Sequence, residues 1–286
     1  MDLRAKAWLR ASGADTARAA AGEGFYAALL ARAPSGPSEL DSERQIELDL
    51  DRTFAEHPWL RTPPARDALR RVLVAAARAA PQHGYAQSMN YVAAFALLTF
   101  RADEESAFWV VRAALERLAP PQTYARDLEG LHVELRTLST LLTAKVPRVA
   151  EKLASIGADT SLFATEWLLC LFTCTLPAET TARVWDAYLF EGAKVLVRVS
   201  IALLKMHEAA LMRCDEVGAF IATLKTAAAR THDRDALMLL AFDGIGSLSG
   251  ARLQRLRDAA TLEVASERAD VSARRGSIRP STAPAR

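Results

Sequence analysis

Hydrophobic residues recur along most of this chain at the three- and four-residue spacing of an amphipathic helix. Leu69, Val72, Leu73 and Ala76 fall on one helical face, and this stripe ends before Pro81. Alternating β-branched runs between paired turn signals, which would indicate β-hairpins, are missing. No repeat of fixed period is present, which argues against a solenoid. The pattern therefore predicts an all-α fold.

Further helices are predicted where such stripes begin near a proline or end near a glycine. Their expected ranges are 42–54, 128–142, 147–157, 163–174, 177–192, 193–212, 216–229 and 235–242. Ser42 and Gln45 have the spacing of a capping box, so we expect the first of these helices to begin at Ser42. The preceding stretch ARAPSGPSELD, residues 31–41, has the composition of a loop.

The helices are expected to form one all-helical domain over residues 1–245, followed by a terminal helix over residues 246–264. Residues 265–286 are polar, basic and rich in Ser and Pro, and they carry no apolar stripe. Such a segment cannot bury enough apolar surface to order itself, so we expect a disordered tail there.

Composition narrows the classes of function. Of the 286 residues, 51% are hydrophobic, which is enough to build a core. The 36 Lys+Arg and 34 Asp+Glu give a net charge of +2, which argues against a nucleic-acid binder. Three cysteines are too few for a disulfide framework and fit reduced thiols. With no apolar signal core and no run of bilayer length, we expect a cytoplasmic protein without a transmembrane segment.

Motifs for self-contained catalysis are missing. The chain has no GxxxxGK[ST] loop and no GxSxG elbow, and His207-Glu208 lacks the second histidine of a zinc helix. Cys170 and Cys174 lie one helical turn apart without further ligands nearby, so we interpret them as core thiols. We therefore expect no metal and no cofactor bound by the chain itself.

Two short segments place polar groups in a strong helical or apolar context. In the first, Asp49 and Arg52 are three residues apart, so the carboxylate can orient the guanidinium. An ordinary surface ion pair is the simpler interpretation of this spacing. In the second, Gln87 follows Gly84 and precedes an apolar helix, where it could equally cap backbone N–H groups or face water.

Taken together, the segments resemble the TBC domain, the catalytic module of GTPase-activating proteins for Rab GTPases. Ile46-x-x-Asp49-x-x-Arg52 looks like the IxxDxxR motif of that family, and Tyr85-x-Gln87 looks like its YxQ motif. Further similar stretches are Arg4-x-x-x-Trp8, Trp167 to Phe172, Leu176-Pro177, Arg183-Val-Trp185-Asp186 and Glu191-Gly192. The resemblance spans residues 3–242 in the correct order, and the fold of the family is all-helical.

The resemblance implies roles for individual residues. Arg52 would be an arginine finger and Gln87 a glutamine finger, both supplied in trans to the GTPase. Asp49 would orient Arg52, while Tyr85 and Asn90 would support the glutamine loop. The implied partner is a GTP-bound Rab, which carries the GTP and Mg²⁺ itself. This also implies a place in vesicle trafficking, with peripheral association at endomembranes through the Rab.

One departure from the family pattern leaves an alternative open. Ser88 stands where the family usually has Gly after the glutamine finger. A glycine allows backbone dihedrals that serine tolerates less well, so the loop could be displaced. The alternative is a catalytically weak or inactive scaffold or effector that binds a Rab.

Overall fold

The structure, a computed structural model, describes residues 3–277, and the regular elements in that range are helices without any β-strand. The first group comprises α1 (Leu3–Ala11), α2 (Ala14–Ala21), α3 (Phe25–Ala31), α4 (Pro37–Leu50), α5 (Pro63–Ala79), α6 (Met89–Thr99), α7 (Glu104–Arg112) and the π-helical η1 (Ala113–Leu118). The second comprises α8 (Glu129–Lys145), α9 (Pro147–Ser155), α10 (Ser161–Leu169), α11 (Ala178–Glu191), α12 (Lys194–Met206), α13 (Glu208–Leu211), α14 (Val217–Ala229), α15 (Arg234–Leu239), the π-helical η2 (Leu240–Gly244) and α16 (Gly250–Ser277). The predicted all-α fold is confirmed over these residues.

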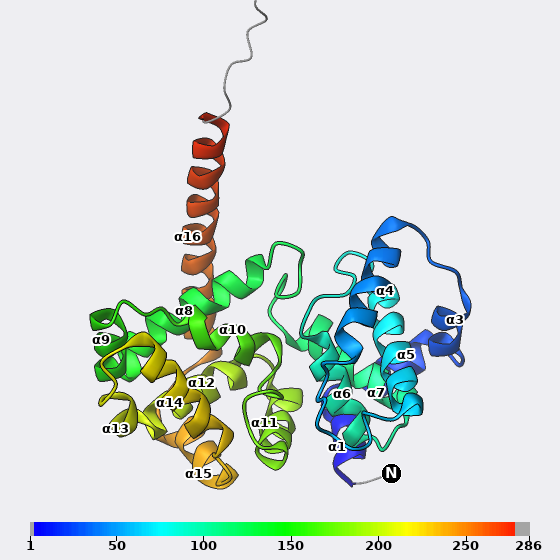
Figure 1. The fold of residues 1–286 in the computed structure, drawn as a ribbon, viewed down its shortest axis with the longest axis horizontal. Coiled ribbons are helices and arrows are strands. Elements are labelled where there is room, and N and C mark those ends of the chain that lie inside the picture. The colour runs from blue at the N-terminus through cyan, green and yellow to red at the C-terminus, as the bar shows by residue number, and fades with distance from the viewer. Residues whose placement is uncertain (1–2, 278–286) are drawn as a thin grey trace, which may run out of the picture.

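The two groups lie side by side, with α11 of the second group packed on α1 of the first (Figure 1). Trp8 of α1 and Trp185 of α11 are fully buried, and their ring centroids are 5.3 Å apart. Trp8 also donates its indole N–H to Asp186 Oδ1 at 2.8 Å, and Phe95 of α6 packs on both tryptophans. Residues that are far apart in sequence therefore build the junction between the groups.

The start of α4 differs from the prediction. The helix begins at Pro37, inside the expected loop, and Ser42 lies in its middle. Proline is well suited to the first helical turn because its fixed φ matches the helix and its missing N–H is not needed there. The predicted capping box at Ser42 is therefore wrong. Ile46 and Leu50, one helical turn apart in α4, lie in the core.

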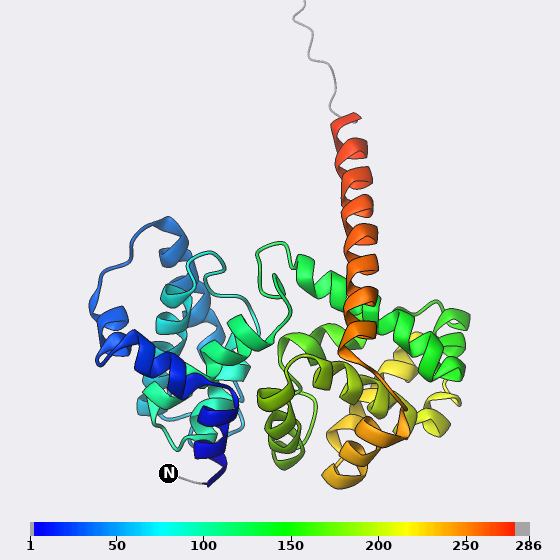
Figure 2. The same cartoon turned by 180° about the vertical axis from the view of Figure 1, so that it is seen from behind.

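The end of the chain also differs from the prediction. Helix α16 is continuous from Gly250 to Ser277, so residues 265–277 lie in it and not in a disordered tail. It crosses α8 and then projects away from the rest of the molecule (Figure 2). Charged contacts hold it where an apolar stripe is missing, because Arg268 pairs with Asp127 at 2.7 Å and Glu267 pairs with Arg136. The last part of the expected tail, residues 278–286, lies outside the described residues.

Two other predicted helices are shorter than expected. The one expected over residues 193–212 is divided at His207 into α12 and α13. The one expected to reach Cys174 ends at Leu169, because Leu171 and Phe172 in the following turn adopt φ values of +50° and +65°. Among the described residues, none of the helices is long and apolar enough to cross a membrane.

Candidate functional site

Arg52 lies in the turn that immediately follows α4, and its side chain is exposed. Its Nη2 is 2.6 Å from Oδ1 of Asp49, which occupies the last turn of the helix and is only 3% exposed. The predicted ion pair between residues three apart is therefore confirmed. Because one partner is buried, the guanidinium is oriented by a carboxylate that the surrounding helices hold in place.

Gln87 lies at the end of the loop between α5 and α6, and it is also exposed. Its amide oxygen accepts a hydrogen bond from Arg52 Nη2 at 2.7 Å, in the amide orientation that presents an acceptor to the guanidinium. The side chain therefore points at Arg52. The structure brings together the two residues that the resemblance singled out as fingers.

Tyr85 joins the glutamine loop to the same carboxylate. Its hydroxyl donates to Asp49 Oδ2 at 2.5 Å, while Asp49 Oδ1 contacts Arg52. Burial, followed by the hydrogen bond to Asp49, raises the pKa of Tyr85, so its hydroxyl keeps its proton and acts as a donor. Asp49 is thus the shared anchor of the arginine turn and the glutamine loop.

Asn90, in the first turn of α6, is fully buried. It donates to Thr53 Oγ1 at 2.7 Å, and Thr53 in turn donates to the backbone carbonyl of Asp49 at 2.6 Å. The neighbouring Tyr91 donates its hydroxyl to the carbonyl of Arg52 at 3.3 Å. Asn90 therefore contacts the arginine turn through its side chain, and its backbone N–H also hydrogen-bonds to the hydroxyl of Tyr85 in the glutamine loop. Its support of that loop stays a prediction.

Arg52 and Gln87 both line a cleft of about 1070 Å³ between the two groups of helices. Leu162 of α10 and Lys225 of α14 line it from the second group, and Arg126 enters it from the loop before α8. The lining includes the cationic side chains of Arg52, Arg126 and Lys225, which outnumber the carboxylate of Glu166. Such a surface attracts a negatively charged ligand or partner.

Ser88, next to Gln87, has φ +90° and ψ −22°. This left-handed conformation is one that glycine adopts readily and other residues adopt at a cost of roughly 1–2 kcal/mol. Hydrogen bonding with Cys174, and to a smaller extent with the Ser88 hydroxyl, lowers the pKa of the Cys170 thiol. Serine therefore occupies the backbone conformation that a glycine would take, and Gln87 still reaches Arg52.

The cysteines only partly match the prediction. Cys170 is buried, as expected of a core thiol, whereas Cys174 is partly exposed, and both line the cleft. Among the described residues, no cluster of three or more His, Cys, Asp or Glu side chains is arranged to hold a metal ion.

Two contributors to the site escaped the sequence reasoning. Thr53 directly follows Arg52, and this position was the signal in the sequence that could have identified it. Its burial became visible only in the structure. Ser42 was assigned to a helix cap. Its hydroxyl instead accepts the backbone N–H of Tyr85 at 3.1 Å.

Comparison with known proteins identifies relatives of this helical domain in sequence and in structure. Residues 1–212 match the family model described as the Rab-GTPase-TBC domain. The crystal structure of the Chlamydomonas flagellar RabGAP TBC domain superposes with a TM-score of 0.77 at 37% identity, covering 86% of this chain and 81% of that one. The Ypt/Rab-GAP domain of Gyp1p superposes with a TM-score of 0.64 at 21% identity, with 77% of each chain covered, and shows the shared fold.

Two relatives illustrate the range of sequences. TBC1 domain family member 2A of Mus musculus is 37% identical over 82% of this chain, which spans about a quarter (26%) of that relative's length. Growth hormone-regulated TBC protein 1 of Xenopus laevis is 32% identical over 92% of this chain and 77% of its own length. Together with the helical architecture, these matches define a TBC-type helical domain. The chain belongs to the Rab-GTPase-TBC domain family.

Proposed function

We propose that this protein accelerates GTP hydrolysis by a Rab-family small GTPase, to which it supplies Arg52 and Gln87 in trans. The observation that carries the proposal is the direct contact between these two exposed side chains at the edge of a cationic cleft. Its partner is the GTP-bound Rab, which brings the nucleotide and Mg²⁺. Association with membranes occurs through that Rab.

The chemistry of hydrolysis explains why these two side chains belong together. Negative charge spreads over the phosphoryl oxygens as the terminal phosphate departs, and a water molecule must be held in line with it. Arginine stays protonated and presents a planar fork of donors to that charge. A carboxamide both accepts from and donates to a water, so it orients the nucleophile without acting as a strong base.

The buried Asp49 carboxylate prepares Arg52 for this role. It holds the guanidinium at 2.6 Å before any partner arrives, so less side-chain freedom is lost when the complex forms. Tyr85 donates to the other oxygen of the Asp49 carboxylate, so the loop that carries Gln87 is bound to the same residue as Arg52. The two fingers are therefore pre-organised relative to each other.

The proposal is tested by single-turnover GTP hydrolysis across a panel of GTP-loaded Rabs. Wild-type protein should accelerate at least one Rab, and Arg52→Ala should lose on the order of 10³-fold or more of that acceleration. Gln87→Ala should also lose most of it, because the water is then no longer oriented.

Matched controls are available in the same chain. Arg44 also pairs with an aspartate three residues away, at 3.5 Å from Asp41, but it is highly exposed and lies outside the cleft. Gln254 is an exposed glutamine on α16. Arg44→Ala and Gln254→Ala should keep wild-type rates. A wild-type protein that binds a Rab without accelerating its hydrolysis would instead favour a non-catalytic scaffold.

A further inference from the structure

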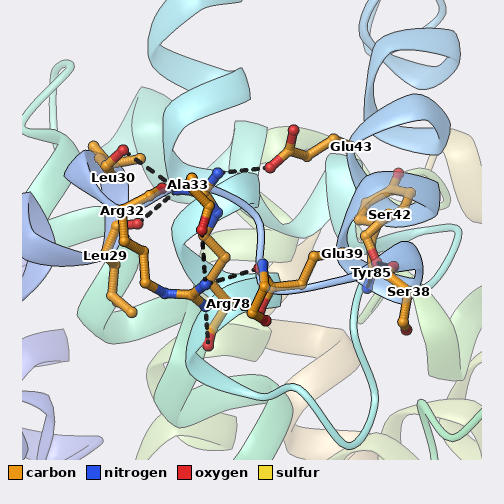
Figure 3. A network of polar contacts seen from close by, with 11 residues as sticks. Leu29, Leu30, Arg32, Ala33, Ser38, Glu39, Ser42, Glu43, Arg78 and Tyr85 are labelled. Carbon is orange, nitrogen blue, oxygen red and sulfur yellow. Dashed lines mark hydrogen bonds and ion pairs between the residues drawn. The ribbon is translucent and has the colours of Figure 1, made fainter.

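Ser42 is a polar residue buried in the middle of α4, with only 9% of its surface exposed. Its hydroxyl donates to the carbonyl of Ser38, one helical turn earlier, at 3.0 Å. Serines inside helices commonly make this bond. Ser42 also accepts a second bond, from the backbone N–H of Tyr85 at 3.1 Å, and that bond comes from the loop that carries Gln87 (Figure 3).

The loop is shaped to approach this hydroxyl closely. Gly84, the residue before Tyr85, has φ +65°. A Cβ atom built on Gly84 would lie 2.8 Å from Ser42 Oγ, which is closer than real Cβ contacts allow. Glycine at this position therefore permits both the left-handed turn and the short distance between loop and helix.

Tyr85 is consequently held at two points by one helix. Its backbone N–H is bound by Ser42, and its side-chain hydroxyl is bound by Asp49. Ser42 and Asp49 are seven residues apart, about two helical turns, so they project from the same face of α4. Gln87 lies two residues beyond Tyr85. Both contacts of Tyr85 with α4 are therefore close to Gln87 in the chain.

The helix itself is fixed near Ser42. The buried guanidinium of Arg78, at the end of α5, donates to the carbonyls of Leu29 and Arg32 and pairs with Glu43 at 2.7 Å (Figure 3). Arg32 in turn makes a two-pronged contact with Glu39. The network joins α4 to the end of α5, where the glutamine loop begins. The Ser42 hydroxyl is therefore a fixed point relative to the start of that loop.

We propose that Ser42 is a positioning residue for Gln87, acting through the backbone of Tyr85. This inference rests on the proposed function of Gln87. Without the hydroxyl, the N–H of Tyr85 loses its partner, and of the two contacts that connect Tyr85 to α4 only the one made by its side chain remains. Orientation of the attacking water matters only in the transition state, so the loss should appear in kcat and leave KM almost unchanged.

The decisive experiment compares Ser42→Ala with Ser200→Ala on the Rab that responds to the wild-type protein. Ser200 is a matched control because it is buried in α12 and its hydroxyl likewise bonds the carbonyl one turn earlier. Ser42→Ala should lower kcat on the order of 10-fold, since small misplacements of reacting groups cost up to 10²-fold. Ser200→Ala should keep the wild-type kcat.

Two further readouts separate positioning from a general structural effect. In the double variant Ser42→Ala/Gln87→Ala, kcat should be no lower than in Gln87→Ala alone, because the two changes act through one group. The backbone amide of Tyr85 should exchange faster with solvent in Ser42→Ala. The amide of Gly84, which bonds the carbonyl of Ala80, should be unaffected.

The possible outcomes distinguish the inference from the proposed function. If the wild type accelerates a Rab, Gln87→Ala abolishes the effect and Ser42→Ala keeps full kcat, the inference alone is overturned. Additive losses in the double variant, or an equal drop in Ser200→Ala, would also overturn it. If no Rab responds to the wild type, the proposed function falls and takes the inference with it.

Discussion

In the amide orientation that presents an acceptor, the side-chain oxygen of Gln87 lies 2.7 Å from Nη2 of Arg52, although one side chain comes from the turn after α4 and the other from the loop before α6. The same Nη2 atom is 2.6 Å from the buried carboxylate of Asp49. The arginine is therefore held between an anchor inside the protein and a second functional group at the surface. The predictions below follow from this arrangement and from the contacts that support it.

Tyr85→Phe should lower the free energy of unfolding by about 1.5–3 kcal/mol, the usual range for a hydrogen bond to a charged group. The change removes only the hydroxyl that donates to Asp49. Tyr124→Phe is the matched control, because its hydroxyl donates to the neutral carbonyl of Leu169 and should contribute less, about 0.5–1.5 kcal/mol. Urea unfolding of both variants tests this, and an equal or smaller loss for Tyr85→Phe would contradict it.

Ser88 should tolerate glycine but not a β-branched residue. Its φ of +90° costs a non-glycine residue roughly 1–2 kcal/mol, and Ser88→Gly relieves that strain while adding freedom to the unfolded chain. Thermal unfolding should therefore show Ser88→Gly to be at least as stable as wild type. Ser88→Val should be less stable and should lose GTPase acceleration. A stable and fully active valine variant would show that the loop backbone is not strained.

Trp8→Ala should destabilise the protein by about 3–5 kcal/mol, the usual cost of deleting a large buried aromatic side chain. Trp8 contacts Trp185 and Asp186 across the junction between the two groups of helices. Trp59→Ala serves as the control, because Trp59 is only partly buried and should cost less. Chemical unfolding monitored by circular dichroism measures both. Equal losses would mean that the junction contributes nothing beyond ordinary burial.

Glu39 should make stability fall in acid. Two hydrogen bonds from Arg32, then a contact with the Ser35 N–H, lower the pKa of Glu39 from 4.5 to about 2. The unfolded carboxyl therefore binds a proton over a range of pH in which the folded one does not. This contribution to stability is complete above about pH 4.5 and is lost as the pH falls toward about 2.

Glu39→Gln removes the ionisable group and tests that contribution. Urea midpoints should be measured for wild type and variant at several values between pH 7 and pH 2.5. The difference between the two proteins should be largest at neutral pH and shrink in acid. A constant difference across this range would contradict the prediction.

The parts of the site that follow local spacing could be predicted, and those that depend on tertiary contacts could not. Asp49 and Arg52 are three residues apart, with Asp49 in the last turn of α4 and Arg52 in the turn that follows, so their ion pair was predictable from sequence. The contact between Gln87 and Arg52 joins two separate segments, and only the resemblance to a known family suggested it. The hydrogen bond between the Tyr85 N–H and the Ser42 hydroxyl also joins two separate segments, so local spacing could not predict it.

The predicted fold class was right, while several element ends were wrong for physical reasons. Pro37 begins α4 within a stretch whose Gly, Pro and Ser content is typical of a loop. Ion pairs from Arg268 and Glu267 hold α16 beyond residue 265, where an apolar stripe is missing. Hydrophobic periodicity carries no information about such charged contacts, so the pattern predicted disorder for residues 265–277, which are helical.

The most direct test of the central claim is whether Arg52 engages the terminal phosphate position of a bound Rab at the transition state. Aluminium fluoride with GDP mimics the phosphoryl group in flight, and analogues of this kind bind far more tightly than ground states. The responsive Rab, loaded with GDP, should form a stable complex with the wild-type protein only when aluminium fluoride is added, and Arg52→Ala should abolish that complex. Binding that is indifferent to aluminium fluoride, or that survives Arg52→Ala unchanged, would contradict the account.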